Sequence, residues 1–384
     1  LSIENLLDKK LSNLSGGELQ QVLIAGTIVN KSDLYIFDEP SSFLDIGQRV
    51  RISDVIRQNT DSVTFIVDHD LTFLESVCDS VHILYGNPSS YGVVSNSLSV
   101  RNGINDYVKG YVSSDDVMIR SDSFDFNIQG SKNSELEDIS IRYDDYSVTV
   151  GEFNLTVNKG EIRESQVVGI LGKNGLGKTT FSKSLTGSMT GGPKFKFSVS
   201  YKPQYLEVND KDVLVSNYIA QVPDLHGGIL DNIRSKLSID EILDQRLGEL
   251  SGGELQRLSI AVCISRDADI YVLDEPSAYL DVETRNTVGD LLSNYSSKTG
   301  HPVLVIDHDI FLINTVSDSI IVFKGESGKN GVASTVMDLS DGMNEFLSEI
   351  GITVRKDKDT KRPKINKKGS QLDKEQRKQK KFYR

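Results

Sequence analysis

One stretch of the chain has the residues and spacing of a loop that binds nucleotide phosphates. Residues 172–179 read Gly-Lys-Asn-Gly-Leu-Gly-Lys-Thr and fit the Walker A pattern G-x4-G-K-S/T. An apolar run at 167–171 precedes them, and a helical pattern follows. Glycines let successive backbone N–H groups close around a β-phosphate, and the start of the helix adds a positive dipole end. The predicted ATP-binding residues are Gly172, Asn174, Gly175, Gly177, Lys178, Thr179 and Thr180.

Two loop residues and a pair of carboxylates are predicted to carry the chemistry. Lys178 is expected to reach the β- and γ-phosphate oxygens, and the Thr179 hydroxyl is expected to bind Mg²⁺. Asp274 and Glu275 end the apolar run 270–273, and open α/β sheets bind ligands at the carboxyl ends of their strands. Asp274 is therefore the expected Mg²⁺ ligand, directly or through water. Glu275 is the expected general base for the attacking water.

A histidine and a glutamine complete the predicted catalytic group. His308 follows the apolar run 303–306, and a histidine recurs at the equivalent position of a sequence repeat, His69. This recurrence favours a functional histidine over a structural one. Gln204 lies 26 residues past Lys178 (178 to 204) and is a candidate contact for Mg²⁺ and the lytic water. A surface amide is the alternative interpretation of Gln204.

The chain repeats one block of sequence, so the elements around these residues are expected twice. The copies stand at 14–20 and 250–256 for LSGGELQ, at 38–41 and 274–277 for DEPS, and at 68–70 and 307–309 for DHD. The first two motifs repeat after 236 residues and the third after 239. A repeat at nearly fixed spacing indicates a duplicated cassette, with a loop that differs by three residues.

Helical and apolar stretches alternate in both copies. The predicted helices are 20–29 and 256–265, each after a Gly-Gly turn, and the predicted buried parallel strands are 34–37, 63–67, 270–273 and 303–306. Short continuous apolar runs are typical of parallel strands that are buried on both faces. The alternation predicts an α/β fold with a parallel sheet.

The composition of the 384 residues narrows the class of protein. The net charge is −12, yet residues 355–384 carry 14 Lys and Arg against 4 Asp and Glu. An acidic body with a basic tail favours a local contact between the tail and a polyanion, with a disordered tail as the alternative. No apolar run reaches the length of a membrane-spanning helix. Cys78 and Cys263 are predicted to be buried, reduced thiols of a cytoplasmic protein.

Together these motifs resemble those of the ABC ATPases, which hydrolyse ATP. In that family the LSGGELQ signature of one cassette closes over ATP that is held by the Walker A loop of the other. The resemblance implies that the nucleotide at 172–179 is faced by Ser15, Gly17, Glu18 and Asp45. It implies a second, partial composite site with Ser251, Gly253, Glu254, Asp38, Glu39, His69 and Asp281. Tyr143, 29 residues before Gly172, is a candidate for stacking on adenine, with Tyr146 as its competitor and a core position as the alternative for either.

The segments that follow each cassette resemble the hinges of ABCE-type ATPases, the ribosome recycling family also called RNase L inhibitor. The hinge resemblance rests on 85–94, 99–105, 110–112, 342–347, 352–357 and 362–367, and the stretches 201–204 and 275–281 of the second cassette also match that family. The family uses ATP and Mg²⁺, splits ribosomes after termination with a release factor and stays on the small subunit into initiation. It also carries two iron–sulfur clusters and another Walker A loop in an N-terminal region. Neither is in this sequence, which begins with Leu rather than Met and is expected to be a fragment.

The expected fold class is α/β, with two P-loop NTPase (ABC-type) nucleotide-binding domains, the first only partly present, joined by hinge segments. The predicted parts are 1–85, the end of the first domain; 86–115, a hinge; 116–325, the second domain; and 326–384, a second hinge and basic tail. Small-subunit RNA phosphates are the predicted partners of hinge cations such as Arg101, Lys109, Arg355, Lys356 and Lys361. The alternatives are an ABCF-type translation factor, which has a long charged linker, and an ABC transporter ATPase subunit, which needs membrane domains in trans.

Overall fold

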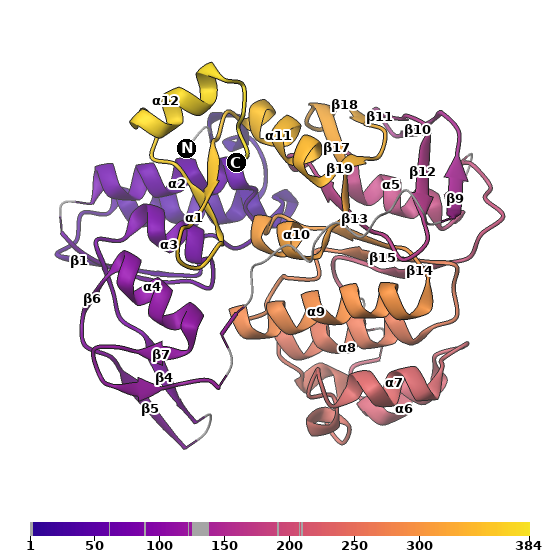
Figure 1. The fold of residues 1–384 in the computed structure, drawn as a ribbon, viewed down its shortest axis with the longest axis horizontal. Coiled ribbons are helices and arrows are strands. Elements are labelled where there is room, and N and C mark those ends of the chain that lie inside the picture. The colour runs from indigo at the N-terminus through magenta and orange to yellow at the C-terminus, as the bar shows by residue number, and fades with distance from the viewer. Residues whose placement is uncertain are drawn as a thin grey trace. The chain divides into compact units, whose positions relative to one another are not determined.

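The structure, a computed structural model, forms two compact units (Figure 1). It describes residues 3–60, 62–87, 90–121, 123–124, 138–189, 192–206, 208 and 210–384, so Pro88 and Ser89 of the predicted first hinge lie outside the described residues. The first unit contains the described residues up to 124 with 352–382 and 384, and the second contains 138–351 with Tyr383. Within the described part of the chain, none of the helices combines the length and apolar character needed to cross a membrane.

The second unit is built on a sheet whose strand order is β10-β11-β18-β17-β13-β16-β15-β14, with β19 paired to β17. Its strands are β10 (Tyr146–Val150), β11 (Phe153–Val157), β13 (Val167–Leu171), β14 (Val199–Lys202), β15 (Ile270–Asp274), β16 (Val303–Ile306), β17 (Ser319–Glu326), β18 (Asn330–Ala333) and β19 (Met337–Asp338); β9 (Ile139–Tyr143) pairs with β12 (Gly160–Arg163). Its helices are α5 (Lys178–Leu185), α6 (Val215–Gln221), α7 (Gly227–Arg234), α8 (Gly252–Ser265), α9 (Val282–Thr299), α10 (Ile310–Val316) and α11 (Leu339–Ile350).

The parallel centre of this sheet fixes where its loops emerge. Strand β16 pairs in parallel with both β13 and β15, and every residue of the three strands is buried. Helices α8 and α9 lie on one side of these strands and α5 lies on the other (Figure 1). Because parallel strands end at the same edge, the loops after Leu171, Asp274 and Ile306 come together there. This arrangement confirms the predicted α/β fold.

The first unit repeats the motif-bearing part of this architecture. Its helices are α1 (Gly16–Val29), α2 (Ile46–Asn59), α3 (Leu71–Val77), α4 (Val100–Lys109) and α12 (Gln371–Lys378). Its strand pairs are β1 (Leu34–Asp38) with β2 (Val63–Val67), β3 (Ser80–Val81) with β6 (Leu98–Ser99), β4 (Leu84–Asn87) with β5 (Tyr91–Val94), β7 (Tyr111–Val112) with β8 (Val117–Met118), and β20 (Val354–Lys356) with β21 (Pro363–Ile365).

The predicted burial of the strands is right for the second unit and wrong for the first. Ile36 and Phe65 are 64% and 55% exposed on one face of the β1–β2 pair. Their equivalents in the repeat, Val272 and Leu304, are fully buried in a core cluster that includes α5 residues. In the first unit, no layer of described residues covers this face.

Both signature helices begin earlier than the sequence predicted. The Gly-Gly pairs form the first turns of α1 and α8 and do not precede the helices. Ser15 and Ser251 cap these helices, and each has a glutamate three residues on, Glu18 and Glu254, that completes a capping box. The capping box satisfies N–H groups at the helix start, so the helix extends through the glycines.

The predicted hinge segments and the basic tail fold onto the two units. Residues of the first predicted hinge lie in the first unit, and α4 occupies most of its second half. The tail is ordered, because β20, β21 and α12 pack within the first unit, whereas α11 belongs to the second. The two units therefore divide the chain differently from the four predicted parts. Whether the predicted segments act as hinges is a question of motion and stays a prediction.

A buried ion pair attaches the tail to α3. The Arg362 side chain has no exposed surface, and its guanidinium lies 3.0 Å from the Glu75 carboxylate. Lys364 also pairs with Glu75. Removing one partner of a buried pair leaves an uncompensated charge, which is strongly destabilising.

We therefore expect Glu75→Gln to destabilise the first unit by about 3 kcal/mol or more, because Arg362 loses its buried counter-ion. The change in the free energy of unfolding is measured by urea unfolding, with hydrogen exchange of residues 352–382 as the probe. The control is Asp79→Asn, which removes an exposed ion pair with Arg57 in the same unit and should cost about 1 kcal/mol or less. Equal effects of the two variants would contradict the role of the buried pair.

Candidate functional site

The Walker A loop has the backbone that its glycines were predicted to supply. Gly175 and Gly177 have φ of 76° and 90°, the left-handed region that only glycine adopts at little cost. Gly177 is the N-cap of α5, so this helix starts at the loop. The Lys178 ammonium donates to the carbonyls of Gly172 and Lys173 at 2.8 and 2.9 Å. The buried Lys178 ammonium thus links the two ends of the loop.

The residues predicted to hold magnesium lie together. The Thr179 hydroxyl donates to Asp274 at 2.7 Å, and the Tyr201 hydroxyl lies 3.3 Å from the same carboxylate oxygen. Burial raises the pKa of Asp274. Among the described residues, no group of three or more His, Cys, Asp or Glu side chains could hold a metal ion by itself. One hydroxyl and one carboxylate suit a Mg²⁺ ion whose other coordination positions would be filled by phosphate oxygens and water.

The predicted base lies beside His308, which we call the switch histidine. Nε2 of His308 is 3.5 Å from the Glu275 carboxylate, and both side chains are largely buried. Burial, with the nearby charges of Asp307 and Asp274, raises the pKa of Glu275 to about 7. A hydrogen bond with Gln204 opposes this rise, so the predicted glutamine also reaches the base. A buried carboxyl group with a perturbed pKa at a sheet edge is a typical catalytic candidate.

The aspartate before the switch histidine has a structural role. Asp307 accepts hydrogen bonds from the Ser277 hydroxyl at 2.7 Å and from the backbone N–H of Asp309 at 2.8 Å. Asp68 makes the same two contacts in the first unit, with Ser41 and Asp70, each at 2.7 Å. The short carboxylate of the Asp-His-Asp motif therefore ties the strand end to the loop after the acidic pair.

The remaining predicted residues divide between the two units. In the first, Glu39 lies 3.6 Å from His69, next to Asp38 at the end of β1.

Asp45 and Asp281 cap α2 and α9 through their side chains. Gly17 has no room for a Cβ, which would stand 2.7 Å from the Phe43 carbonyl oxygen, and a Cβ on Gly253 would stand 3.0 Å from the Tyr279 carbonyl oxygen. The signature at 14–20 and the Walker A loop belong to different units, so their closure over one nucleotide stays a prediction.

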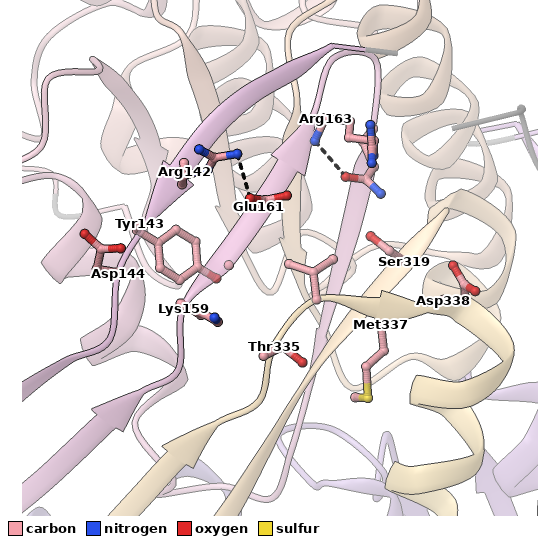
Figure 2. A pocket seen from close by; sticks show the side chains of 13 residues that line it. Arg142, Tyr143, Asp144, Lys159, Glu161, Arg163, Ser319, Thr335, Met337 and Asp338 are labelled. Carbon is pink, nitrogen blue, oxygen red and sulfur yellow. Dashed lines mark hydrogen bonds and ion pairs between the residues drawn. The ribbon is translucent and has the colours of Figure 1, made fainter. Parts of the chain in front are cut away.

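Tyr143 does not have the position predicted for an adenine platform. It is buried at the edge of Phe181, and its hydroxyl has no hydrogen-bond partner among the described residues. This hydroxyl points into a polar pocket of about 420 Å³ (Figure 2). Gln166 and Ser319 line the pocket at the amino ends of β13 and β17, whereas the Walker A loop follows the carboxyl end of β13. The hydroxyl of Tyr146, the competing candidate, forms a hydrogen bond with the Ser184 hydroxyl.

An aromatic side chain that does lie at the Walker A loop is Phe153, which the sequence analysis missed. Its ring is so close to Gly177 that a Cβ there would stand 2.8 Å away. It is also near Gly331 of β18. The only sequence signal was an aromatic residue at the start of a strand, which is too common to single out.

Comparisons with known proteins show what the chain is similar to. The family model described as ABC transporter matches residues 1–42 and 154–278. An uncharacterised ABC transporter ATP-binding protein of Methanocaldococcus jannaschii is 43% identical over the whole chain, and Translation initiation factor RLI1 of Saccharomyces cerevisiae is 36% identical over 98% of it. The chain spans 64% of the length of each of these relatives.

A solved structure is similar over the entire chain. It contains the archaeal ribosome recycling factor aABCE1 in complex with the archaeal ribosomal stalk protein aP1. The match has a TM-score of 0.90 and 40% sequence identity, and it covers 100% of this chain and 75% of that one.

We expect Lys178→Ala to weaken ATP binding about 100-fold, because charged hydrogen bonds to phosphate worth about 2–3 kcal/mol are lost. Titration of the purified chain with a fluorescent ATP analogue and Mg²⁺ measures the affinity. Lys183→Ala, an exposed position on the same helix, is the control and should bind like the wild type. Unchanged binding by Lys178→Ala would place the nucleotide elsewhere.

Proposed function

Because the chain belongs to the ABCE-type family of twin-cassette ABC ATPases, we propose that it binds ATP at residues 172–179 and hydrolyses it there. The observation that supports this most directly is the meeting of Thr179, Asp274, Glu275 and His308 at one edge of the second unit's sheet. Glu275 is the base that takes a proton from the attacking water, and His308 holds the Glu275 carboxylate in place. Thr179 and Asp274 would hold Mg²⁺, which would neutralise charge at the phosphates when bound.

We propose that the same hydrolysis drives ribosome recycling. The similarity to an archaeal ribosome recycling factor and to a translation initiation factor supports this function. In this proposal ATP closes the signature at 14–20 over the Walker A loop, and hydrolysis reopens the two units. The small ribosomal subunit, a release factor and a cytoplasmic site of action belong to the same proposal. The iron–sulfur clusters stay a prediction from the family resemblance.

The partial site of the first unit needs a second Walker A loop. The exposed apolar face of the β1–β2 pair supports the expectation of such a segment, because the equivalent face in the second unit packs against Phe181 and Leu185 of α5. A segment like residues 138–202 would cover Ile36 and Phe65 and bring a phosphate loop to Glu39. The signature at 250–256 would then face the second nucleotide.

Replacing the base separates binding from turnover. Glu275→Gln keeps the shape of the side chain but cannot accept the proton, so ATP turnover should fall about 100-fold or more while ATP affinity is kept. The trapped ATP state should also increase co-sedimentation with small ribosomal subunits. Phosphate release and sedimentation in the presence of ATP measure the two effects.

Glu283→Gln is the control, because Glu283 is exposed on the first turn of α9. It should turn over ATP like the wild type. Normal turnover by Glu275→Gln would show that another group is the base.

Exposed cations of the predicted hinges are the proposed contacts with ribosomal RNA. Lys109, Lys358 and Lys361 are exposed within the first unit. Arg101 and Arg355 already have partners in Asp359 and Asn366, so they are less suited to a test by charge reversal. Each phosphate contact releases counterions and makes binding dependent on salt.

We expect Lys109→Glu, Lys358→Glu and Lys361→Glu each to weaken small-subunit binding and to lower the slope of log K against log salt by about 1. Co-sedimentation across a salt series measures both quantities. Lys236→Glu, an exposed position in the second unit, is the matched control. Identical salt slopes for all four variants would contradict an RNA contact through the predicted hinges.

A further inference from the structure

A buried lysine lies directly beneath the carboxylate pair of the second unit. Lys202, the last residue of β14, is 1% exposed. Its ammonium donates to the main-chain carbonyl of Asp274 at 2.8 Å and lies 3.5 Å from that of Glu275. Within the described part of the chain, no carboxylate oxygen is within ion-pair distance of this ammonium. The cation is therefore held by the backbone of the acidic pair and not by its side chains.

A lysine ammonium is seldom buried without a carboxylate, because loss of hydration disfavours the charge. Apolar residues of similar volume would fill the space without this cost. The acceptors available to Lys202 are the two carbonyls, and both belong to residues proposed to carry the chemistry. This arrangement points to a use for the ammonium at the backbone of the pair.

The backbone that the lysine contacts is in an unfavourable conformation. Glu275 has φ of 48°, which a residue with a side chain rarely adopts. Its N–H donates to the carbonyl of Ile306 at 2.8 Å, and its own carbonyl accepts from Gln256 at 2.5 Å. Lys202 adds a charged donor to the carbonyls on both sides of this residue. The turn is therefore held by β16, by the signature helix α8 and by β14.

The first unit has the same turn with the same supports from a strand and a signature helix. Glu39 has φ of 45°, its N–H donates to Val67, and its carbonyl accepts from Gln20 at 3.0 Å. The left-handed turn therefore occurs at the same position of both repeats. It also provides an internal reference for any test made in the second unit.

We propose that Lys202 is a positioning residue for ATP hydrolysis: its ammonium holds the left-handed turn at Glu275 and so aims the carboxylate at the attacking water. The proposal rests on the proposed role of Glu275 as the base. Lys202 touches neither nucleotide nor water in this account; it acts only through the peptide groups of Asp274 and Glu275.

The test compares Lys202→Met with the wild type in the full chain. Methionine keeps an unbranched side chain of similar length and removes the donors. Amide hydrogen exchange of residues 274–278, measured without nucleotide, should become about tenfold faster, because the turn loses one of its supports. Exchange of residues 38–42 in the same molecule should not change. Turnover should fall about tenfold in kcat, with KM and the affinity for an ATP analogue within about threefold of the wild type.

Two further variants keep the test decisive. Lys183→Met, an exposed position, should match the wild type in exchange and turnover. Lys202→Gln keeps a donor but shortens its reach, so exchange at 274–278 should rise about threefold or more even if the methionine variant does not fold.

Unchanged exchange at 274–278 would overturn the proposal whatever the turnover. Faster exchange with unchanged kcat would also overturn it, because the turn would then not limit hydrolysis. A uniform loss of stability, with kcat per folded molecule unchanged, would reduce Lys202 to a structural residue and overturn it too. Absence of turnover in the wild type would instead remove the proposed function, and the positioning role would fall with it.

Discussion

The parallel pairing of β13, β16 and β15 is the constraint on which the site depends. Each strand ends where a functional loop begins: the Walker A loop after Leu171, the acidic pair at Asp274, and His308 after Ile306. The three strands are buried on both faces, so a slip in register would cost the core as well as the site. The fold thereby fixes the distances between residues that are more than 130 positions apart in the sequence (171 to 306).

A second layer of contacts fixes the loops themselves. The Asp307 carboxylate ties the switch loop to Ser277, and the Glu275 turn is tied to β16 and to the signature helix. Gln256 lies in the signature of one proposed nucleotide site, and Glu275 is the proposed base of the other. This contact, repeated between Gln20 and Glu39, physically connects residues of the two proposed nucleotide sites within each unit.

The sequence predicted the elements that carry local signals. The strands at 63–67 and 303–306 have the predicted bounds, and the carboxylates, histidine and glutamine of the second unit lie together as expected. What was missed depends on packing between distant segments. No local pattern distinguishes a buried Tyr143 from an exposed one, or reveals that Lys202 and Arg362 are buried with their charges. The helix starts were predicted too late because the glycines were read as a turn, whereas the serine before them caps the helix and the glycines form its first turn.

The most direct test of the account is the structure of the chain with a non-hydrolysable ATP analogue and Mg²⁺. The account predicts the β- and γ-phosphates inside the backbone N–H groups of residues 172–179. It also predicts the Glu275 carboxylate and His308 at the γ-phosphate and Ser15 of the other unit's signature on the same nucleotide. A nucleotide bound elsewhere, or one at the loop with Glu275 turned away and the signature not engaged, would contradict it.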